Sequence, residues 1–186
     1  MPPAVPATSG LVLLCLDVQP TFLKAIDCAD TLQRRCAFAL QAAAGLGLDI
    51  IFTEQVPQKL GGTAPELLAL VPSPVVFPKT TFSALADAAI LAAVQSRHAE
   101  HLLLCGIETP VCVYQTAIDA RHAGLEVTLL TDCVGARRPD DARTCLDALA
   151  RAGVHVLPSE TVFYALLRDA THPFFKTYTR LVKAHA

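Results

Sequence analysis

Apolar runs of strand length alternate along the chain with segments in which apolar residues recur at helical spacing. The first run, LVLLCLD at 11–17, is continuously apolar and ends in an aspartate, which is typical of a strand covered on both faces. After it, Leu32, Cys36 and Ala43 lie on one face of a predicted helix at 30–46. The chain therefore begins with a strand followed by an amphipathic helix.

The same reasoning predicts six strands and the helices that connect them. Strands are expected at 11–17, 49–54, 74–79, 100–107, 125–132 and 154–158. Helices are expected at 30–46, 84–97, 113–124 and 140–152, with a short piece at 67–70 and one or two helices over 159–183, interrupted near Pro173. This alternation predicts an α/β fold, a three-layer α/β/α sandwich around a six-stranded, mostly parallel, Rossmann-like sheet.

One domain is expected to hold all of these elements. A chain of 186 residues is long enough for one substantial core, and no repeat, linker or low-complexity segment divides it. The first ten residues contain three prolines, which argues against regular structure there. We therefore predict a flexible N-terminal tail at 1–10 and a single domain at 11–186.

Charge and cysteine content narrow the function classes. The 15 basic and 17 acidic residues are scattered, so no basic surface of a nucleic-acid-binding protein is expected. No apolar run reaches the roughly 18 residues of a membrane span, and the N-terminus lacks the pattern of a secretory signal. The seven cysteines are odd in number and form no C-x-x-C pair, which favours reduced thiols. We expect a cytoplasmic protein that binds neither nucleic acid nor membrane.

Candidate chemistry lies where the predicted strands end, because ligands of open parallel sheets bind beyond the carboxyl ends of the strands. Asp17 and Lys79 end two predicted strands, and Cys112 follows a third within GIETPVCV at 106–113. Pro110 suits the first turn of a helix, which would place Cys112 near the positive end of the helix dipole and lower the pKa of its thiol. Alternatively, Cys112 is a buried residue that fills the junction between strand and helix.

A nucleophilic thiol needs a base, and no histidine falls at a suitable strand end. Asp17 is the available base, and Lys79 is a cation that could keep Asp17 ionised or stabilise the thiolate. Each residue also has an ordinary alternative, a turn cap for Asp17 and a solvated loop lysine for Lys79. Spacing alone leaves these alternatives open.

Four segments of the sequence resemble the isochorismatase-like cysteine hydrolase family. They are LCLDVQPTF, FTEQVPQKLGGTAPEL, FPKTTFSAL and LLLCGIETPVCVYQTAIDARHAGLEVTLLTDCVGAR, and the resemblance extends from about Leu11 to Thr161. It is greatest to the metal-free branch, which includes the isochorismatase domain-containing proteins. The resemblance implies that 11–186 is a hydrolase domain of this type.

The resemblance also implies roles for individual residues. Asp17 in LDVQ matches the general base of the family, Lys79 in PKTTFSAL its catalytic lysine, and Cys112 in GIETPVCV its nucleophile. Family members carry a cis peptide bond just before the cysteine, here between Ile107 and Glu108. The amides near Glu108 and Cys112 would then face the oxyanion of the substrate.

Two departures from the wider family bear on the reaction. Nicotinamidases carry an aspartate and two histidines that bind a metal near the second strand, but FTEQVPQKLGG contains no histidine. We therefore expect no catalytic metal, no other cofactor and no nicotinamidase activity. True isochorismatases lack the nucleophilic cysteine, so Cys112 argues against that reaction. Pro110 stands where several relatives have a histidine.

The resulting expectation is a hydrolase that cleaves a small amide, a carbamate or a related C–N bond through a thioester on Cys112. By adjacency, the substrate pocket is expected to include Gln19, Phe22, Gln55 and Phe82. The Ala-rich predicted helices, together with the resemblance, indicate a homo-oligomer. Three alternatives are an interaction protein without activity, a nucleotide-binding domain, which lacks its glycine-rich motif here, and redox chemistry at Cys112.

Overall fold

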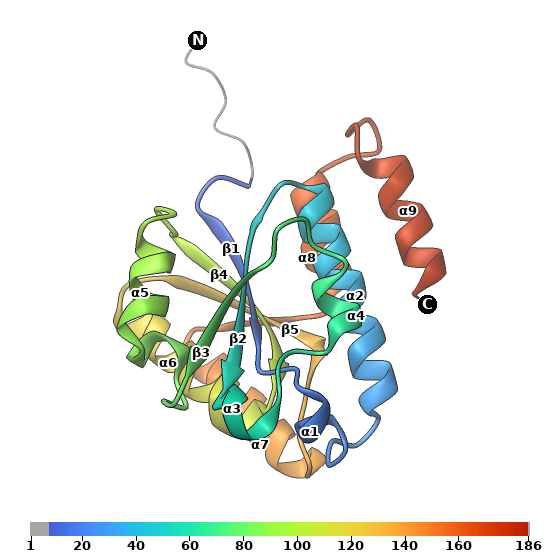
Figure 1. Cartoon of the computed structure of the whole chain (residues 1–186). Helices are drawn as coiled ribbons and strands as arrows, with labels where there is room; N and C mark the ends of the chain where they lie inside the picture. The colour runs from blue at the N-terminus through green and yellow to red at the C-terminus, as the bar shows by residue number, and fades with distance from the viewer. Residues whose placement is uncertain (1–7, 186) are drawn as a thin grey trace.

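A computed structural model describes residues 8–185 and contains a six-stranded sheet in the order β3-β2-β1-β4-β5-β6 (Figure 1). All five neighbouring pairs of strands run parallel, as the α/β pattern predicted. The strands are β1 (Leu11–Leu16), β2 (Asp49–Gln55), β3 (Val75–Lys79), β4 (His101–Ile107), β5 (Glu126–Gly135) and β6 (His155–Leu157).

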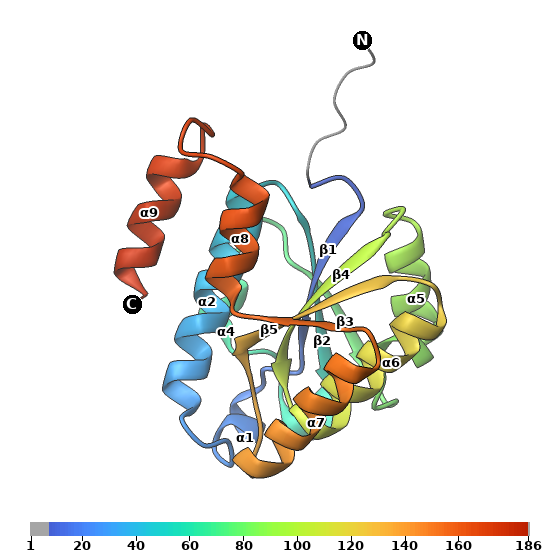
Figure 2. The same cartoon turned by 180° about the vertical axis from the view of Figure 1, so that it is seen from behind.

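Helices cover both faces of the sheet, which gives the three layers expected from the sequence (Figures 1 and 2). One face carries α2 (Ala29–Gly45), α4 (Pro65–Leu68), α8 (Ser159–Leu167) and α9 (Phe175–Ala184). The other face carries α5 (Ala88–Gln95), α6 (Tyr114–His122) and α7 (Pro139–Arg151). The short helices α1 (Pro20–Leu23) and α3 (Pro57–Leu60) follow the carboxyl ends of β1 and β2.

The central strand β1 contributes to both cores because its side chains alternate between the two faces of the sheet. Leu13 and Cys15 pack into the core beneath α2. Leu14 and Leu16 pack into the core beneath α6 on the opposite face. Every residue of β1 is buried, which explains why its sequence is continuously apolar rather than alternating.

One predicted helix differs in detail from the structure, and one predicted interruption is confirmed. The helix expected at 84–97 is divided into a 3-10 turn, η1 (Ala84–Ala86), and α5. The division falls at Asp87, whose carboxylate accepts hydrogen bonds from the amides of Ala89 and Ile90 and so starts a new helix. The interruption expected near Pro173 is confirmed, since α8 and α9 lie on either side of it.

The predicted N-terminal tail at 1–10 lies mostly outside the described residues. Within the described part, Thr8 to Gly10 form a turn, and the Leu11 amide donates to the Thr8 carbonyl at 3.2 Å. Across residues 8–185, no helix is both long and apolar enough to cross a bilayer. The first strand follows this turn directly, at Leu11.

The chain reverses its direction of strand addition next to β1. After β1 it adds β2 and β3 on one side, and then returns to place β4, β5 and β6 on the other side. The loops that leave β1 and β4 therefore diverge to opposite faces, and a crevice forms between the carboxyl ends of these two strands. Asp17 and Cys112 follow these two strands, so the topology brings them to the same crevice.

Candidate active site

Asp17 directly follows β1 and is held in an unusual backbone conformation. Its φ is 53°, in the left-handed region that aspartate tolerates better than most residues. The Asp17 amide donates to the Thr53 carbonyl at 3.1 Å, and the Thr53 hydroxyl donates to Oδ1 of Asp17 at 2.7 Å. With 1% of its surface exposed, Asp17 is a buried carboxylate fixed by β2.

Lys79 is the last residue of β3, and it is also buried. Its Nζ lies 2.8 Å from Oδ2 of Asp17 and donates to Sγ of Cys112 at 3.6 Å. The three side chains predicted from strand ends therefore contact one another, although they are distant in sequence.

The same ammonium group has three further oxygen neighbours. Gln55 Oε1 lies at 2.5 Å, and the carbonyls of Thr81 and Phe82 lie at 3.0 and 3.3 Å. An ammonium has only three hydrogens, so these oxygens compete with Asp17 and Cys112 for its donors. Lys79 thereby connects the Asp17 carboxylate and the Cys112 thiol to the loop that follows β3.

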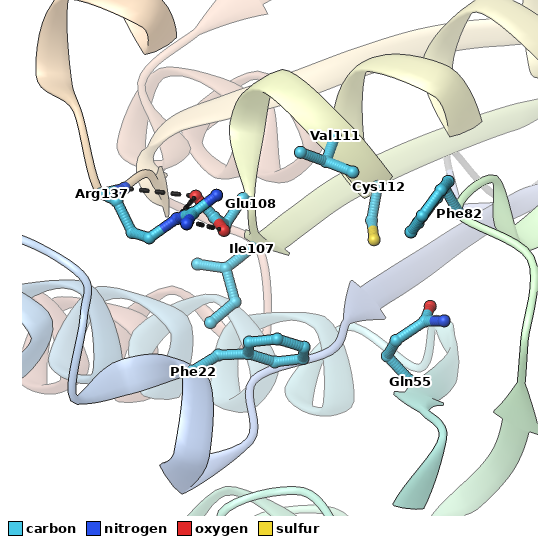
Figure 3. A pocket seen from close by; sticks show the side chains of 8 residues that line it. All are labelled: Phe22, Gln55, Phe82, Ile107, Glu108, Val111, Cys112 and Arg137. Carbon is cyan, nitrogen blue, oxygen red and sulfur yellow. Dashed lines mark hydrogen bonds and ion pairs between the residues drawn. The ribbon is translucent and has the colours of Figure 1, made fainter. Parts of the chain in front are cut away.

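Cys112 lies in a π-helical turn, η2 (Thr109–Val113), between β4 and α6. The amides of Val111 and Val113 both donate to the Glu108 carbonyl, which closes the turn. The Ile107–Glu108 peptide bond that precedes it is cis in the structure. This turn directs Sγ into a pocket beside Phe82 and Gln55 (Figure 3).

The pKa of Cys112 differs from the sequence prediction. Burial, followed by the charge of Asp17, raises the pKa of the Cys112 thiol to about 12, although Lys79 acts to lower it. The prediction of a lowered pKa was wrong because loss of solvent and a neighbouring carboxylate outweigh the helix end and the single ammonium. At neutral pH the resting group is a thiol, and a base must remove its proton.

A pocket of about 290 Å³ opens onto Cys112 (Figure 3). Its lining includes three of the four residues expected there and five others: Phe22, Gln55, Phe82, Ile107, Glu108, Val111, Cys112 and Arg137. Four of these side chains are aliphatic or aromatic hydrocarbons. The pocket therefore offers a mainly apolar wall around one sulfur atom.

Gln19, the fourth expected pocket residue, is not part of this lining. It is fully buried, and its side chain bonds to the backbone of Gln55 in both directions, at 3.1 Å to the carbonyl and 2.8 Å from the amide. Its amide also donates to the Gly61 carbonyl. Gln19 thus holds the end of β2 and the loop that follows it in place. It lies near Asp17 in sequence, but its side chain has this structural role and does not line the pocket.

Arg137 is a pocket residue that the sequence reasoning did not find. It follows the end of β5, and its Nε lies 2.9 Å from Oε1 of Glu108. The Arg137 side chain is 62% exposed and that of Glu108 13%, so the pair lies at the solvent-facing side of the pocket. The strand-end rule would have found Arg137 if β5 had been extended beyond Asp132.

No group of three metal-ligating side chains is present within residues 8–185. All seven cysteines fall in this range, and each is a free thiol. In contact with the Cys112 thiol, the Asp17 carboxylate and the Lys79 ammonium form a set suited to proton transfer and acyl chemistry.

Comparison with known proteins agrees with this arrangement. The family model described as the isochorismatase domain matches residues 11–161, which include β1, β3 and the η2 turn. The chain belongs to the isochorismatase domain family. The expected resemblance is therefore confirmed, and so is the parallel α/β fold of an isochorismatase-family hydrolase.

Among individual relatives, isochorismatase domain-containing protein 1 of Salmo salar is 36% identical over 98% of this chain. The chain spans only 63% of the length of that relative. Isochorismatase domain-containing protein 2A of Mus musculus is 35% identical over 94% of this chain and 83% of its own length.

A solved structure of the MAR1 ribonuclease from Caenorhabditis elegans superposes with a TM-score of 0.89 at 28% identity. The superposition covers 95% of this chain and 91% of the other. The isochorismatase domain of the present chain thus shares its whole architecture with that protein.

Proposed function

We propose that this isochorismatase-family protein is a cysteine hydrolase that cleaves the C–N bond of a small amide or carbamate through a thioester on Cys112. The observation that carries the proposal is the position of the Lys79 ammonium, 2.8 Å from Asp17 and 3.6 Å from the Cys112 sulfur. Asp17 can then act as the base, Cys112 as the nucleophile, and Lys79 as the cation that contacts both.

In the proposed first step, Sγ of Cys112 bonds to the carbonyl carbon while its proton moves to Asp17. Oδ1 of Asp17 already accepts the Thr53 hydroxyl, whereas Oδ2 receives no well-aligned hydrogen bond from the described residues. Oδ2, which is paired with the Lys79 ammonium at 2.8 Å, is therefore the oxygen proposed to take the proton. Asp17 then passes that proton to the leaving nitrogen as the C–N bond breaks.

In the second step, water attacks the thioester and Asp17 accepts one of the water protons. The S–C bond breaks, the sulfur regains its proton from Asp17, and the product leaves as a carboxylic acid from an amide or as a carbonic acid monoester from a carbamate. A pKa of about 12 for Cys112 fits this scheme, because the nucleophile stays a thiol while the site is empty. Asp17 removes the thiol proton only when the substrate is bound. The backbone amides of Glu108 and Cys112 are the proposed oxyanion donors.

The pocket also limits the substrate. A volume of about 290 Å³ is at the lower end of small-molecule sites. Phe22, Phe82, Ile107 and Val111 provide its apolar wall. We therefore expect a compact amide or carbamate that carries an apolar group, rather than a polymer.

A screen of small amides and carbamates tests the proposal, followed by mass spectrometry for an acyl adduct on Cys112. Cys112→Ala is expected to lose at least about 1,000-fold in turnover, because the covalent step is removed. It should also form no adduct while keeping the circular dichroism spectrum of the wild type. Cys28→Ala, at an exposed cysteine, is the matched control and should keep full activity.

Full activity of Cys112→Ala toward the identified substrate would disprove the nucleophile assignment. If no amide or carbamate is cleaved and Cys112 stays unmodified by acyl compounds, the alternative of an inactive interaction protein is favoured. RNA belongs in the same screen because of the ribonuclease from C. elegans. The present site favours RNA less than a small amide. The exposed cation that lines the pocket is Arg137, and Glu108 already neutralises it, so little positive charge is left for a phosphate.

A further inference from the structure

The two oxygens of Asp17 have different surroundings, and one neighbouring residue creates the difference. Thr53 lies on β2, is fully buried, and donates its hydroxyl to Oδ1 of Asp17 at 2.7 Å. Oδ2 faces the Lys79 ammonium at 2.8 Å as an ion pair. One oxygen of the carboxylate thus accepts the Thr53 hydroxyl, and the other is paired with Lys79.

Thr53 also controls the backbone of Asp17. Its carbonyl accepts the Asp17 amide at 3.1 Å, just where Asp17 leaves the strand with a φ of 53°. One residue therefore contacts Asp17 through the main chain and the side chain together. A carboxylate held at two points cannot exchange its oxygens by rotation without breaking the Thr53 hydrogen bond.

We propose that Thr53 is a positioning residue that makes Oδ2 of Asp17 the atom that accepts the proton of Cys112. The inference rests on the proposed function, because it assumes that Asp17 is the base. Thr53 does not touch the nucleophile. It acts by occupying Oδ1 with a charge-assisted hydrogen bond, which removes Oδ1 from the competition for the proton.

Three titratable groups face the Asp17 carboxylate, and none of them can replace Thr53 in this role. Lys79 approaches from β3 and Cys112 from the η2 turn, both on the side of the pocket. Cys15 lies on β1 itself and is a fully buried thiol in contact with Cys105. The Thr53 hydroxyl is therefore the neutral donor that orients Asp17 at every pH at which the protein is folded.

Alkylation of Cys112 by iodoacetamide tests the inference without knowledge of the substrate. In this reaction the S–C bond forms, iodide leaves and the thiol proton passes to Asp17. The rate at Cys112 is followed by peptide mass spectrometry across pH, which separates it from the other cysteines. If Asp17 is the base, the wild-type rate rises along an acid limb and then reaches a plateau near neutral pH.

Thr53→Val removes the hydroxyl and keeps the shape of the side chain. The plateau of the alkylation rate is expected to fall about tenfold, because Asp17 then spends time with the wrong oxygen toward the thiol. Thr53→Ser should restore the plateau, which a purely structural role would not predict.

Thr128→Val is the matched control. Thr128 is also a buried strand threonine, but its hydroxyl contacts His101 Nε2 at 2.8 Å at the amino-terminal side of the sheet. This variant loses one hydrogen bond and should leave the alkylation profile of Cys112 unchanged. Thr53→Ala is a second hydroxyl-free variant, in case valine at this position does not fold.

The outcomes separate the two proposals. If Asp17→Asn loses the acid limb and the hydroxyl-free Thr53 variants match the wild type, the positioning role is wrong and the hydrolase proposal stands. If the acid limb persists in Asp17→Asn, Asp17 is not the base and both proposals fail. A lowered plateau in Thr53→Val, restored in Thr53→Ser, supports the inference.

Discussion

The charge of Asp17 has two opposite effects on Cys112. It is a proton acceptor close to the thiol, and it is also a negative charge that makes the thiolate less stable. Burial contributes most to raising the pKa of Cys112, and Asp17 contributes next. Lys79 opposes both, since its ammonium lies 3.6 Å from the sulfur. The site thus favours a concerted transfer over a stored thiolate.

Asp17→Asn separates these two effects. Removal of the negative charge is expected to lower the pKa of Cys112 from about 12 by roughly 1–3 units, the usual effect of one nearby charge. Turnover of the substrate found in the screen should nevertheless be lost, because asparagine cannot accept the proton. The pKa of Cys112 is measured from the ultraviolet absorbance of its thiolate across pH. The variant Asp17→Asn/Cys112→Ser, which lacks this thiol, supplies the background absorbance.

Two results would contradict this account at the residue scale. An unchanged thiol titration in Asp17→Asn would mean that the carboxylate is not ionised beside Cys112. Retained turnover would show that another group takes the proton. The thiol titration and the turnover assay use the same preparation of Asp17→Asn. A circular dichroism spectrum of that preparation shows whether the variant is folded.

The elements β1 and β4 approach each other more closely than side chains would permit. Gly106 lies near the end of β4 with a φ of 114°, and a Cβ placed there would be 2.1 Å from the Leu16 carbonyl oxygen. The register of β4 against β5 also shifts between Leu104 and Gly106. Glycine is therefore required where the strand turns toward η2 and Cys112.

Gly106→Ala is expected to lower the free energy of unfolding by about 3 kcal/mol or more, because backbone must move to admit the methyl group. Gly124→Ala is the matched control, since its φ is 82° but a Cβ there meets no atom within 4 Å. It should cost about 1 kcal/mol from backbone strain alone. Chemical denaturation measures both, and equal losses would show that the close approach to β1 is not rigid.

At the scale of the whole molecule, Asp132 connects elements from three regions of the chain. Its carboxylate accepts hydrogen bonds from Arg35 Nε of α2 at 2.8 Å and from the Ser159 amide of α8 at 2.7 Å. Arg35 in turn donates to the His185 carbonyl at 3.2 Å, beyond α9. Asp132, within β5, thus stabilises the fold and does not line the pocket.

The pH dependence of stability tests this connection. Burial opposes the charge of Asp132, but hydrogen bonds from Ser159 and the pairing with Arg35 prevail and lower its pKa. A carboxyl with a lowered pKa stabilises the fold above its unfolded value, near 4, and the gain is lost as pH falls through the folded value.

Asp132→Asn should therefore lose about 1–3 kcal/mol of unfolding free energy at pH 7, and its difference from the wild type should shrink below about pH 4. Denaturant titrations at several pH values measure this difference. Asp147→Asn, at an exposed position of α7, should match the wild type throughout. A difference in unfolding free energy that stays constant across pH would contradict a charged Asp132.

Self-association of the chain stays a separate prediction, which light scattering can test.

The sequence by itself determined the order of elements and the class of sheet. Continuous apolar runs such as 11–17 and helical repeats such as 30–46 encode burial locally, so strand and helix positions were predicted within a few residues. The rule that ligands bind at strand ends was enough to select Asp17, Lys79 and Cys112 as candidates. It could not distinguish Asp132, which ended the predicted strand at 125–132 but lies within β5 and binds Arg35.

Only the tertiary structure decided distances, solvent access and pairing. The raised pKa of Cys112 depends on burial and on a carboxylate 95 residues away in sequence, and neither is visible in GIETPVCV. The role of Gln19 as an anchor for Gln55, and the place of Arg137 in the pocket, likewise depend on which loops meet. Local patterns specify elements because hydrogen bonding and burial repeat along the chain, whereas a site is formed by residues that only the packing of the sheet brings together.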